Sequence, residues 1–357
     1  MKGVVLTGGH GTRLRPLTHT GPKQLIPIAN KPNVLYCIED LRDAGITEIG
    51  IILGDNMPEK VREFLGDGTS FGVRFTYIDQ GPPKGIAHAV GCARTFVGND
   101  AFCVYLGDNL LKGGIRPMVE AFSRGDDAAG ILLCPVPHPE RFGVAEVDAQ
   151  GNVVGLVEKP KAPKSDLALV GIYLLRPSIF PFIEALKPSW RNELEITEAI
   201  DHLRGAGRAV RAFRVTGWWK DTGRPEDILE ANRLVLEELE PRNEGEVEPG
   251  AKVSGRVRIG KGTVVRKGSV IRGPAVIGED CTIGPDASIG PYTAVGDHSQ
   301  IIGADIEDSI VVGDSVIEAP GKIVGSLIGR HASILSADGR GRPGRVLIVG
   351  ENSTAYL

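Results

Sequence analysis

Short apolar runs alternate with amphipathic stretches over the first two thirds of the chain. The apolar runs have the length of strands and fall at residues 4–6, 49–53, 73–78, 102–106 and 131–133. The other stretches repeat apolar residues at helical spacing, at residues 35–44, 58–65, 86–96, 115–122, 196–203 and 225–239. This alternation predicts an α/β domain over residues 1–240, with a mostly parallel sheet that helices cover on both faces.

The pattern changes to a period of six over residues 251–335. Branched apolar residues occupy every sixth position, namely Val253, Ile259, Val265, Ile271, Ile277, Ile283, Ile289, Val295 and Ile301. A mostly small side chain follows each of them four residues later, and glycine follows several of them where a tight corner needs it. This hexapeptide pattern predicts a left-handed parallel β-helix whose interior the branched side chains fill.

Two stretches lie outside these patterns. Residues 240–250 are acidic and rich in proline and glycine, which predicts an exposed connector between the two domains. Residues 336–357 begin with a polar, glycine-rich stretch. We expect them to form a C-terminal tail, as a loop or hairpin that leads to the short apolar run 346–349.

Charge and cysteine usage narrow the function classes. A net charge of −4 and a pI of about 6.0 argue against a nucleic-acid partner, which needs clustered positive charge. The five cysteines are scattered without a CxxC pair, as is typical of reduced thiols in a cytoplasmic protein. No window has the length of a membrane span, and the first apolar run is too short for a signal peptide.

A glycine-rich turn directly follows the first predicted strand. Gly8, Gly9 and Gly11 leave backbone N–H groups available to a phosphate, Arg13 adds a planar set of donors, and Lys23 follows ten residues later. The turn lacks the Gly-Lys-Ser/Thr ending of a Walker A loop and the spacing of a dinucleotide fingerprint. A tight turn with two surface cations is the simpler interpretation, but the combination favours phosphate binding.

Two aspartates stand where a metal ion could be held. Asp108 follows the apolar strand 102–106, and ligands of such sheets bind at the carboxyl ends of the strands. Asp221 lies between an aromatic stretch and a Thr-Gly turn. Two carboxylates together with substrate phosphates are a usual way to hold Mg²⁺, although an Asx turn alone would also explain Asp108.

The stretch GGHGTRLRPLT…PKQLIPIANKP, within residues 8–32, resembles the signature of the sugar-1-phosphate nucleotidyltransferases, especially the glucose-1-phosphate thymidylyltransferases. The similarity continues through most of the first 230 residues. It implies a Rossmann-like mixed, mostly parallel sheet. It also implies a Mg²⁺-dependent enzyme that transfers a nucleoside monophosphate from dTTP to glucose 1-phosphate, giving dTDP-glucose and pyrophosphate.

Further segments are similar to parts of that family's site. Residues 80–87 resemble the segment that reads the nucleobase, residues 106–109 the metal-binding turn, and residues 219–223 the segment with the second metal aspartate. Three more segments resemble the sugar-phosphate site, at residues 141–144, 158–160 and 191–197.

The resemblance implies a role for individual residues. Catalysis falls to Arg13, Lys23, Asp108 and Lys159, and the metal to Asp108 and Asp221. Nucleotide binding falls to Leu6, Gly8, Gly9, Gly11, Thr12, Arg13, Gln24, Gln80, Gly85 and Asp108. The sugar phosphate falls to Gly143, Glu158, Lys159, Val170 and Arg191. No histidine receives a catalytic role, because the chemistry requires none.

Elementary chemistry supports several of these roles and leaves simpler explanations open. Gln80 presents both a donor and an acceptor to a pyrimidine edge. Gly85 would let the backbone approach the base, or it simply starts the following helix. Lys159 would bind the phosphate beside Glu158, or the two form an ordinary surface pair. Arg191 would be a second phosphate ligand, or a loop arginine.

Other functions remain open at this point. The main enzymatic alternative is a uridylyltransferase that uses UTP, or a bifunctional enzyme that also acetylates amino sugars. Acetyl transfer usually needs a histidine base, for which only His298 and His331 are available in the repeat region. A catalytically inactive scaffold is disfavoured because the arginine, lysine and aspartate positions are all present. We expect the β-helix to serve assembly into a homo-oligomer, because its open last coil and flat faces need covering.

Overall fold

The computed structural model describes residues 1–336 and 342–356, and the chain forms two compact units. The first unit contains Met1–His10 and Asn33–Asp221, and the second contains Gly11–Pro32 and Thr222–Leu357. The expected division near residue 240 therefore differs from this grouping. The segment 11–32 and the helix after residue 222 belong to the same unit as the C-terminal strands.

The first unit is built on a nine-stranded mixed sheet. Its parallel strands are β1 (Lys2–Leu6), β4 (Glu48–Leu53), β5 (Arg74–Asp79) and β6 (Phe102–Leu106). The other strands are β8 (Ala129–Pro135), β9 (Gly143–Val147), β10 (Val153–Glu158), β11 (Leu167–Leu175) and β12 (Val210–Arg214). The main order is β10-β9-β11-β6-β1-β4-β5, with β8 joining β11 and β12. All five predicted strands are confirmed. The antiparallel β9 to β11 were not predicted.

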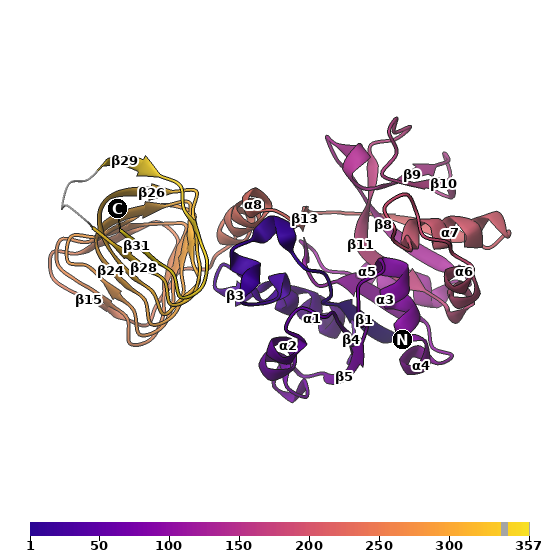
Figure 1. Cartoon of the computed structure of the whole chain (residues 1–357), viewed down its shortest axis with the longest axis horizontal. Helices are drawn as coiled ribbons and strands as arrows, with labels where there is room; N and C mark the ends of the chain where they lie inside the picture. The colour runs from indigo at the N-terminus through magenta and orange to yellow at the C-terminus, as the bar shows by residue number, and fades with distance from the viewer. Residues whose placement is uncertain (337–341, 357) are drawn as a thin grey trace. The chain divides into compact units, whose positions relative to one another are not determined.

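Helices cover both faces of this sheet (Figure 1). Those of the first unit are α1 (Asn33–Asp43), α2 (Pro58–Leu65), α3 (Ile86–Cys92), α4 (Arg94–Val97), α5 (Arg116–Arg124), α6 (Phe180–Glu184) and α7 (Ile196–Gly205). Val4, Phe102 and Val104 pack in one buried cluster with residues of α3, α6 and α7. Their strand neighbour Tyr105 faces the other side, where its hydroxyl donates to Asp40 of α1 at 2.8 Å. The single helix expected over residues 86–96 is broken at Ala93.

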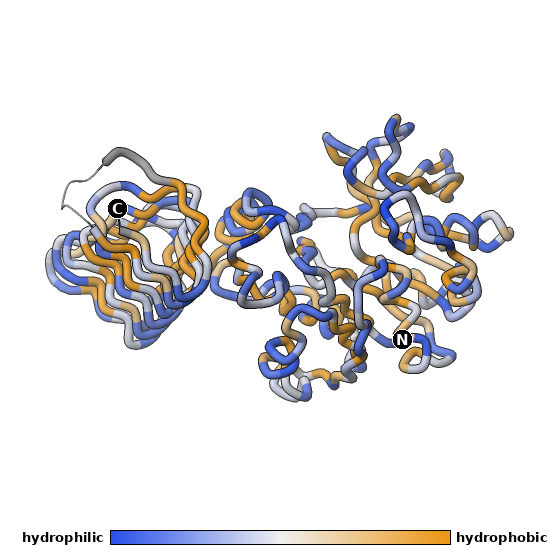
Figure 2. Tube along the Cα trace, in the orientation of Figure 1, coloured by the Kyte–Doolittle hydropathy of each residue, from blue (hydrophilic) through white to orange (hydrophobic). Residues whose placement is uncertain are grey.

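The second unit consists mostly of short parallel strands that fit a β-helix. Residues eighteen apart pair in register, as in Val253↔Ile271 and Ile271↔Ile289. The branched residues from Ile259 onward form one buried cluster, as the period of six predicts. Figure 1 shows the coils stacked, and Figure 2 shows their apolar positions aligned from coil to coil.

Most strands of these coils are short. The strands comprise β16 (Lys252–Ser254), β17 (Val257–Ile259), β18 (Val264–Val265), β19 (Val270–Arg272), β20 (Ala275–Ile277), β21 (Thr282–Ile283), β22 (Ser288–Ile289), β23 (Thr293–Val295), β24 (Gln300–Glu307), β25 (Ile310–Val311), β26 (Val316–Val324), β27 (Leu327–Ile328) and β28 (Ser333–Leu335). Of these, β24 and β26 are the longer ones. The unit also contains α8 (Pro225–Leu236) and the segment 11–32, which carries β2 (Pro27–Ile28) and β3 (Lys31–Pro32).

The expected connector and tail are both parts of the coiled region. β14 (Arg242–Asn243) pairs with β17, and β15 (Glu246–Val247) pairs with β18, so residues 240–250 are not a connector. β29 (Arg342–Arg345), β30 (Ile348–Val349) and β31 (Thr354–Tyr356) pair with β26, β27 and β28, so the expected separate tail is wrong. Residues 337–341 of that tail lie outside the described residues. Strands join a coil through backbone hydrogen bonds, which a polar sequence makes as well as an apolar one.

None of the helices in the described residues is both long and apolar enough to cross a membrane.

Candidate functional site

The parallel strands of the first unit end at one edge of the sheet. β6, β1, β4 and β5 run in the same direction, and the residues just after them are Asp108, Gly8, Gly54 and Gln80. Leu6, from the predicted nucleotide set, is the buried last residue of β1. Three predicted site residues that lie far apart in sequence are therefore brought to the edge where sheets of this kind bind ligands.

Gly8 lies against the side chain of Gln80. A Cβ atom on Gly8 would come within 2.7 Å of Gln80 Oε1, and one on Gly54 would come within 2.8 Å of the Cα atom of Gly8. Gly9 has φ of +100°. The turn therefore requires glycine, because the backbones of Gly8 and Gly54 and the side chain of Gln80 meet there without room for another side chain.

His88 contacts the amide of Gln80. Gln80 Nε2 lies 3.2 Å from His88 Nδ1, and burial together with the Lys84 charge lowers the pKa of His88. The neutral ring accepts the amide N–H at Nδ1, which leaves Gln80 Oε1 directed away from His88. Sequence reasoning gave this histidine no role. The signal was its place in the first turn of the helix that begins within residues 80–87, the segment predicted to read the nucleobase.

Gly85 begins α3 in a conformation that only glycine adopts easily. Its φ is +104°, and a Cβ atom there would lie 2.5 Å from the carbonyl oxygen of Leu194. Ala87 N donates to that carbonyl at 3.0 Å, and Leu194 N donates to Lys84 O at 2.7 Å. The close approach that Gly85 permits is therefore to Leu194, and it joins the segment 80–87 to the segment 191–197.

A separate two-stranded antiparallel sheet brings the two predicted metal aspartates near each other. β7 (Asn109–Leu111) pairs antiparallel with β13 (Trp219–Asp221), and Asp221 stands opposite Asn109, the residue after Asp108. Asp108 is largely buried. The described residues hold no cluster of three or more His, Cys, Asp or Glu that could bind a metal. Two carboxylates fit a hard cation such as Mg²⁺, which completes its shell with substrate phosphates and water.

The side chain of Asn109 links β7 to β13 and to Asp108 through hydrogen bonds. Its Oδ1 accepts Trp219 Nε1 at 2.7 Å and Gly171 N at 3.3 Å, while its Nδ2 donates to Asp108 Oδ1 at 3.2 Å. Trp219 also packs edge-on against Phe142 at 5.4 Å between ring centroids. Asn109 lies within the segment 106–109 that sequence reasoning singled out, but its part in orienting Asp108 was missed.

Three residues predicted for the sugar phosphate meet at one carboxylate. Lys159 Nζ and Arg191 Nη1 each lie 3.5 Å from Glu158 Oε1. Lys159 has φ of +42°, a strained value for a residue with a side chain. Strain of this kind is often found at functional sites, and here the two cations and the carboxylate form a polar cluster that could receive a phosphate.

Buried partners hold this cluster in place. Thr197 Oγ1 donates to Glu158 Oε2 at 2.7 Å, and Arg191 pairs with Glu195 at 3.2 Å. Gly143 has no room for a side chain, because a Cβ atom would lie 2.7 Å from Thr197 Oγ1 and 3.0 Å from Glu158 Oε2. Sequence reasoning included Glu195 and Thr197 in the segment 191–197 but gave neither a role.

Val170 is placed differently from the other predicted sugar-phosphate residues. Its side chain is completely buried in β11. The register between β11 and β8 shifts between Leu169 and Tyr173, so Val170 lies within the irregular part of this pairing. Val170 therefore exposes no surface at which a sugar phosphate could be contacted directly.

The remaining predicted residues belong to the second unit. Arg13 and Thr12 form the 3-10 turn Thr12–Leu14, and Lys23 and Gln24 form the turn Lys23–Leu25. Gly11 has φ of +57°, and its carbonyl accepts Thr18 Oγ1 at 2.8 Å. Their predicted place beside the triphosphate is taken up below as a proposal.

Comparisons with known proteins agree with these features. Residues 2–238 match the family described as Nucleotidyl transferase. The chain is 55% identical over 357 residues to the low-salt glycan biosynthesis nucleotidyltransferase Agl11 of Haloferax volcanii, covering 100% of both chains. It is also 51% identical over 335 residues to a glucose-1-phosphate thymidylyltransferase of Streptomyces antibioticus, covering 94% of this chain and 93% of the relative.

Solved structures are similar over about two thirds of the chain. One, assigned as a glucose-1-phosphate thymidylyltransferase from Bacillus anthracis and bound to sucrose, has a TM-score of 0.62 and 42% identity, covering 66% of this chain and 94% of its own. A UDP-glucose pyrophosphorylase in complex with UDP-glucose has a TM-score of 0.59 and 27% identity, covering 66% and 98%. By its family match and by these relatives, the chain belongs to the nucleotidyl transferase family.

Proposed function

We propose that the protein transfers a nucleoside monophosphate from dTTP to glucose 1-phosphate and releases pyrophosphate. The arrangement at the edge of the first unit's sheet carries this proposal. Gln80 lies against the glycine turn after β1, and the pairing of β7 with β13 brings Asp108 close to Asp221. Backbone hydrogen bonds join the residues around Gly85 to Leu194, in the loop of Arg191. Relatives that cover most of the chain are named for this activity.

The attacking group is a phosphate oxygen of glucose 1-phosphate. It is largely ionised at neutral pH, because the second pKa of a phosphate monoester is about 6, so no general base is needed. The new bond forms between this oxygen and the α-phosphorus as the bond to the leaving pyrophosphate breaks. Lys159 and Arg191 would hold the attacking phosphate, and catalysis would consist of positioning and charge neutralisation.

The carboxylates of Asp108 and Asp221 would hold Mg²⁺. When bound, the cation would neutralise negative charge on the reacting phosphates. Asn109 keeps Asp108 oriented through its amide, which is the contribution of the chain's own residues to this site.

Arg13, Lys23 and the glycine turn would hold the triphosphate. Arg13 offers planar donors to the leaving pyrophosphate, and Lys23 adds a point charge. Thr12, Gln24 and the backbone of Gly9 and Gly11 would complete the phosphate contacts, in accordance with the similarity of residues 8–32 to the family signature.

The nucleotide preference is the finest part of the proposal. Gln80 can pair with the edge of thymine or of uracil, since the two bases present the same donor and acceptor groups there. The likeness to a UDP-glucose pyrophosphorylase keeps a uridylyltransferase as the second candidate function.

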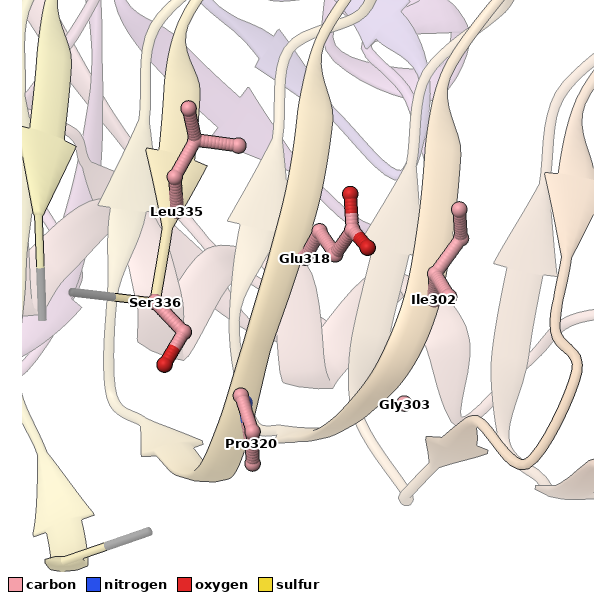
Figure 3. Close-up of a pocket in the computed structure, with 6 residues that line it drawn as sticks. All are labelled: Ile302, Gly303, Glu318, Pro320, Leu335 and Ser336. Atoms are coloured by element: carbon pink, nitrogen blue, oxygen red, sulfur yellow. The ribbon is translucent and has the colours of Figure 1, made fainter. Parts of the chain in front are cut away.

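Acetyl transfer on the coiled region has no observation in its favour. His298 and His331 both lie exposed at corners with positive φ. A hollow of about 500 Å³ is lined by Ile302, Gly303, Glu318, Pro320, Leu335 and Ser336 (Figure 3). No histidine is among these described lining residues, so the hollow lacks the base that acetyl transfer usually needs.

The surroundings of the protein follow from other features. All five cysteines are free thiols, which supports a reducing, cytoplasmic location. The hand of hexapeptide coils is proposed to be left, and assembly into a homo-oligomer through them is proposed on the same pattern.

Pyrophosphate release tests the function. The protein is incubated with Mg²⁺ and glucose 1-phosphate, and dTTP is compared with UTP, CTP, GTP and ATP. We expect fastest release with dTTP. Fastest release with UTP would select the second candidate. No release with any nucleotide and a panel of sugar phosphates would contradict the enzyme assignment.

A further inference from the structure

One column of side chains on the coiled region points outward. Arg258, Val276, Ala294, Ile310, Leu327 and Ile348 stand in register on neighbouring strands. Their strand neighbours, such as Ile277 and Val295, belong to the buried interior of the coils. Successive side chains of a strand face opposite sides, so the column lies on the outer surface of this face.

The centre of this outer column is nevertheless buried. The exposed fractions are 5% for Val276, 0% for Ala294 and Ile310, and 1% for Leu327, whereas Ile348 at the end is 41% exposed. An outer face that keeps apolar residues out of water is covered by other parts of the protein. The segment 11–32 and α8 contact this face close to Ala294, through hydrogen bonds to Val295 O and Tyr292 O.

Two asparagines tie the segment 11–32 to the coils. Asn232 of α8 is completely buried, and its Oδ1 accepts Ala29 N at 2.9 Å while its Nδ2 donates to Tyr292 O at 2.9 Å. Asn30 Nδ2 donates to Val295 O at 2.7 Å. Asn232 therefore bridges the segment and the coils with the oxygen and the nitrogen of its side-chain amide.

The turn that these asparagines hold is strained. Ala29 has φ of +48° and Asn30 has φ of +64°, both in the left-handed region that residues with side chains seldom adopt. Two such residues in succession cost free energy, and the surrounding contacts must compensate for it. The Asn232 bond to Ala29 N and the Asn30 bond to Val295 O supply contacts at these two residues.

The segment has further attachments but little regular structure of its own. A Cβ atom on Gly350, in the last coil, would lie 3.2 Å from Cβ of Pro16. Residues 11–32 themselves contain only short 3-10 turns and the two-residue strands β2 and β3. A segment of this kind depends on outside contacts for its shape.

We infer that the coiled region is a scaffold for the phosphate-binding segment, and that Asn232 and Asn30 are positioning residues for Arg13 and Lys23. This inference rests on the proposed function of those two cations. Asn232 and Asn30 touch no substrate. They fix the end of the segment that carries the cations, so that Arg13 and Lys23 meet the triphosphate in a single arrangement.

The test compares two neighbouring residues of α8 in the full-length protein. Asn232→Ala removes both hydrogen bonds of the side-chain amide. Arg233→Ala removes an exposed ion pair between the same helix and Asp308 of the coils. Steady-state kinetics give kcat and the KM for each substrate. We expect Asn232→Ala to lower kcat/KM for dTTP about 10- to 100-fold and to leave the KM for glucose 1-phosphate within about twofold. Arg233→Ala should match the unchanged protein.

Hydrogen exchange gives a readout that needs no activity. Amides of residues 12–28 should exchange faster in Asn232→Ala than in Arg233→Ala, while amides of β20 and β23 stay protected. If this difference is seen in a protein that transfers no nucleotide, the scaffold stands and the proposed function fails. Equal exchange in the two variants would overturn the scaffold whatever the activity.

A second variant covers the case in which Asn232→Ala does not fold. Asn30→Gly relieves the strain at residue 30 and removes only the bond to Val295 O. It should weaken the binding of dTTP selectively and by less than Asn232→Ala. Equal changes in both substrates' KM would show a merely structural role and contradict the inference.

Discussion

At the scale of single residues, Glu158 shows how the chain arranges charge before a substrate arrives. Lys159 and Arg191 share its Oε1 atom, and Thr197 donates to its Oε2 atom. The carboxylate keeps the two cations close together, although they are separated by more than thirty residues of sequence. A phosphate would find two donors already in place, which is the basis of electrostatic preorganisation.

Replacing Lys159 by methionine should selectively weaken the binding of glucose 1-phosphate. The change removes a charge-assisted hydrogen bond, so we expect the KM for glucose 1-phosphate to rise about 10- to 100-fold. The KM for dTTP should stay within about twofold. Initial-rate kinetics with each substrate varied in turn make the measurement, and an equal rise for both substrates would contradict the assignment. Lys164→Met, at a more exposed lysine paired with Glu146, is the matched control.

His88 should make nucleotide binding depend on pH. Its pKa is lowered first by burial and then by Lys84, and the other groups beside it are Gln80 and the Cys92 thiol. The neutral ring, which accepts from Gln80, therefore persists below histidine's ordinary pKa of about 6.5 and is lost only as pH falls further. We expect the KM for dTTP to be flat above pH 6.5 and to rise below it.

The variant His88→Gln provides the comparison. Its amide oxygen can accept from Gln80 but does not titrate in this range. Kinetics from pH 5 to pH 8 should show the acid rise in the unchanged protein and a flatter profile in the variant. The same rise in both proteins would show that another group is responsible.

At the scale of elements, the pairing of β7 with β13 brings Asp108 and Asp221 near each other although they lie far apart in sequence. Sequence alone placed Asp108 after a strand and Asp221 before a Thr-Gly turn, and the family resemblance assigned both to the metal. The sequence could not predict the pairing of β7 with β13, because each of these strands has only three residues. Short strands leave no periodic signal.

Asp221→Asn should test whether Asp221, at the end of β13, is a metal ligand. The change keeps the shape of the side chain but removes the negative charge that a hard cation requires. We expect kcat to fall by about 100-fold and weaker Mg²⁺ binding by calorimetry in the presence of dTTP. The thermal unfolding temperature should change little. Unchanged Mg²⁺ binding would show that Asp221 is not a ligand.

Gly85→Ala should destabilise the contact between the two substrate segments. Alanine at φ of +104° is strained, and its Cβ atom would clash with the Leu194 carbonyl. We expect the free energy of unfolding to fall by about 3 kcal/mol, measured by denaturant titration. Gly81→Ala, at φ of +67° with nothing within 4 Å of the added atom, should cost less. Equal losses would mean that Leu194 yields at little cost.

At the scale of the whole molecule, two periodicities predict two kinds of architecture. Alternating strands and helices predict the sheet, and the step of six predicts the coils, because each pattern places apolar residues in one interior. The grouping of segment 11–32 with the coils could not be predicted. It depends on Asn232, Ala29 and Tyr292, which are far apart in sequence and form no motif.

The boundaries of the coiled region were also beyond the sequence pattern. Its first strand, Arg242–Asn243, is polar, and its last strand, Thr354–Tyr356, contains no Ile or Val, yet both pair through their backbones with the repeats beside them. The candidate site residues, by contrast, could be proposed from the sequence because glycines and charged residues follow apolar strands. What the sequence could not supply were the hydrogen bonds that Asn109, His88 and Thr197 make to those residues in the folded chain.

Product analysis tests the central claim most directly. The protein is incubated with dTTP, glucose 1-phosphate and Mg²⁺, and both pyrophosphate and the nucleotide sugar are quantified over time. Our account predicts that pyrophosphate and dTDP-glucose appear in equal amounts, and that Asp108→Ala abolishes both while remaining folded. Wild-type turnover by Asp108→Ala, or pyrophosphate released without a nucleotide sugar, would contradict it.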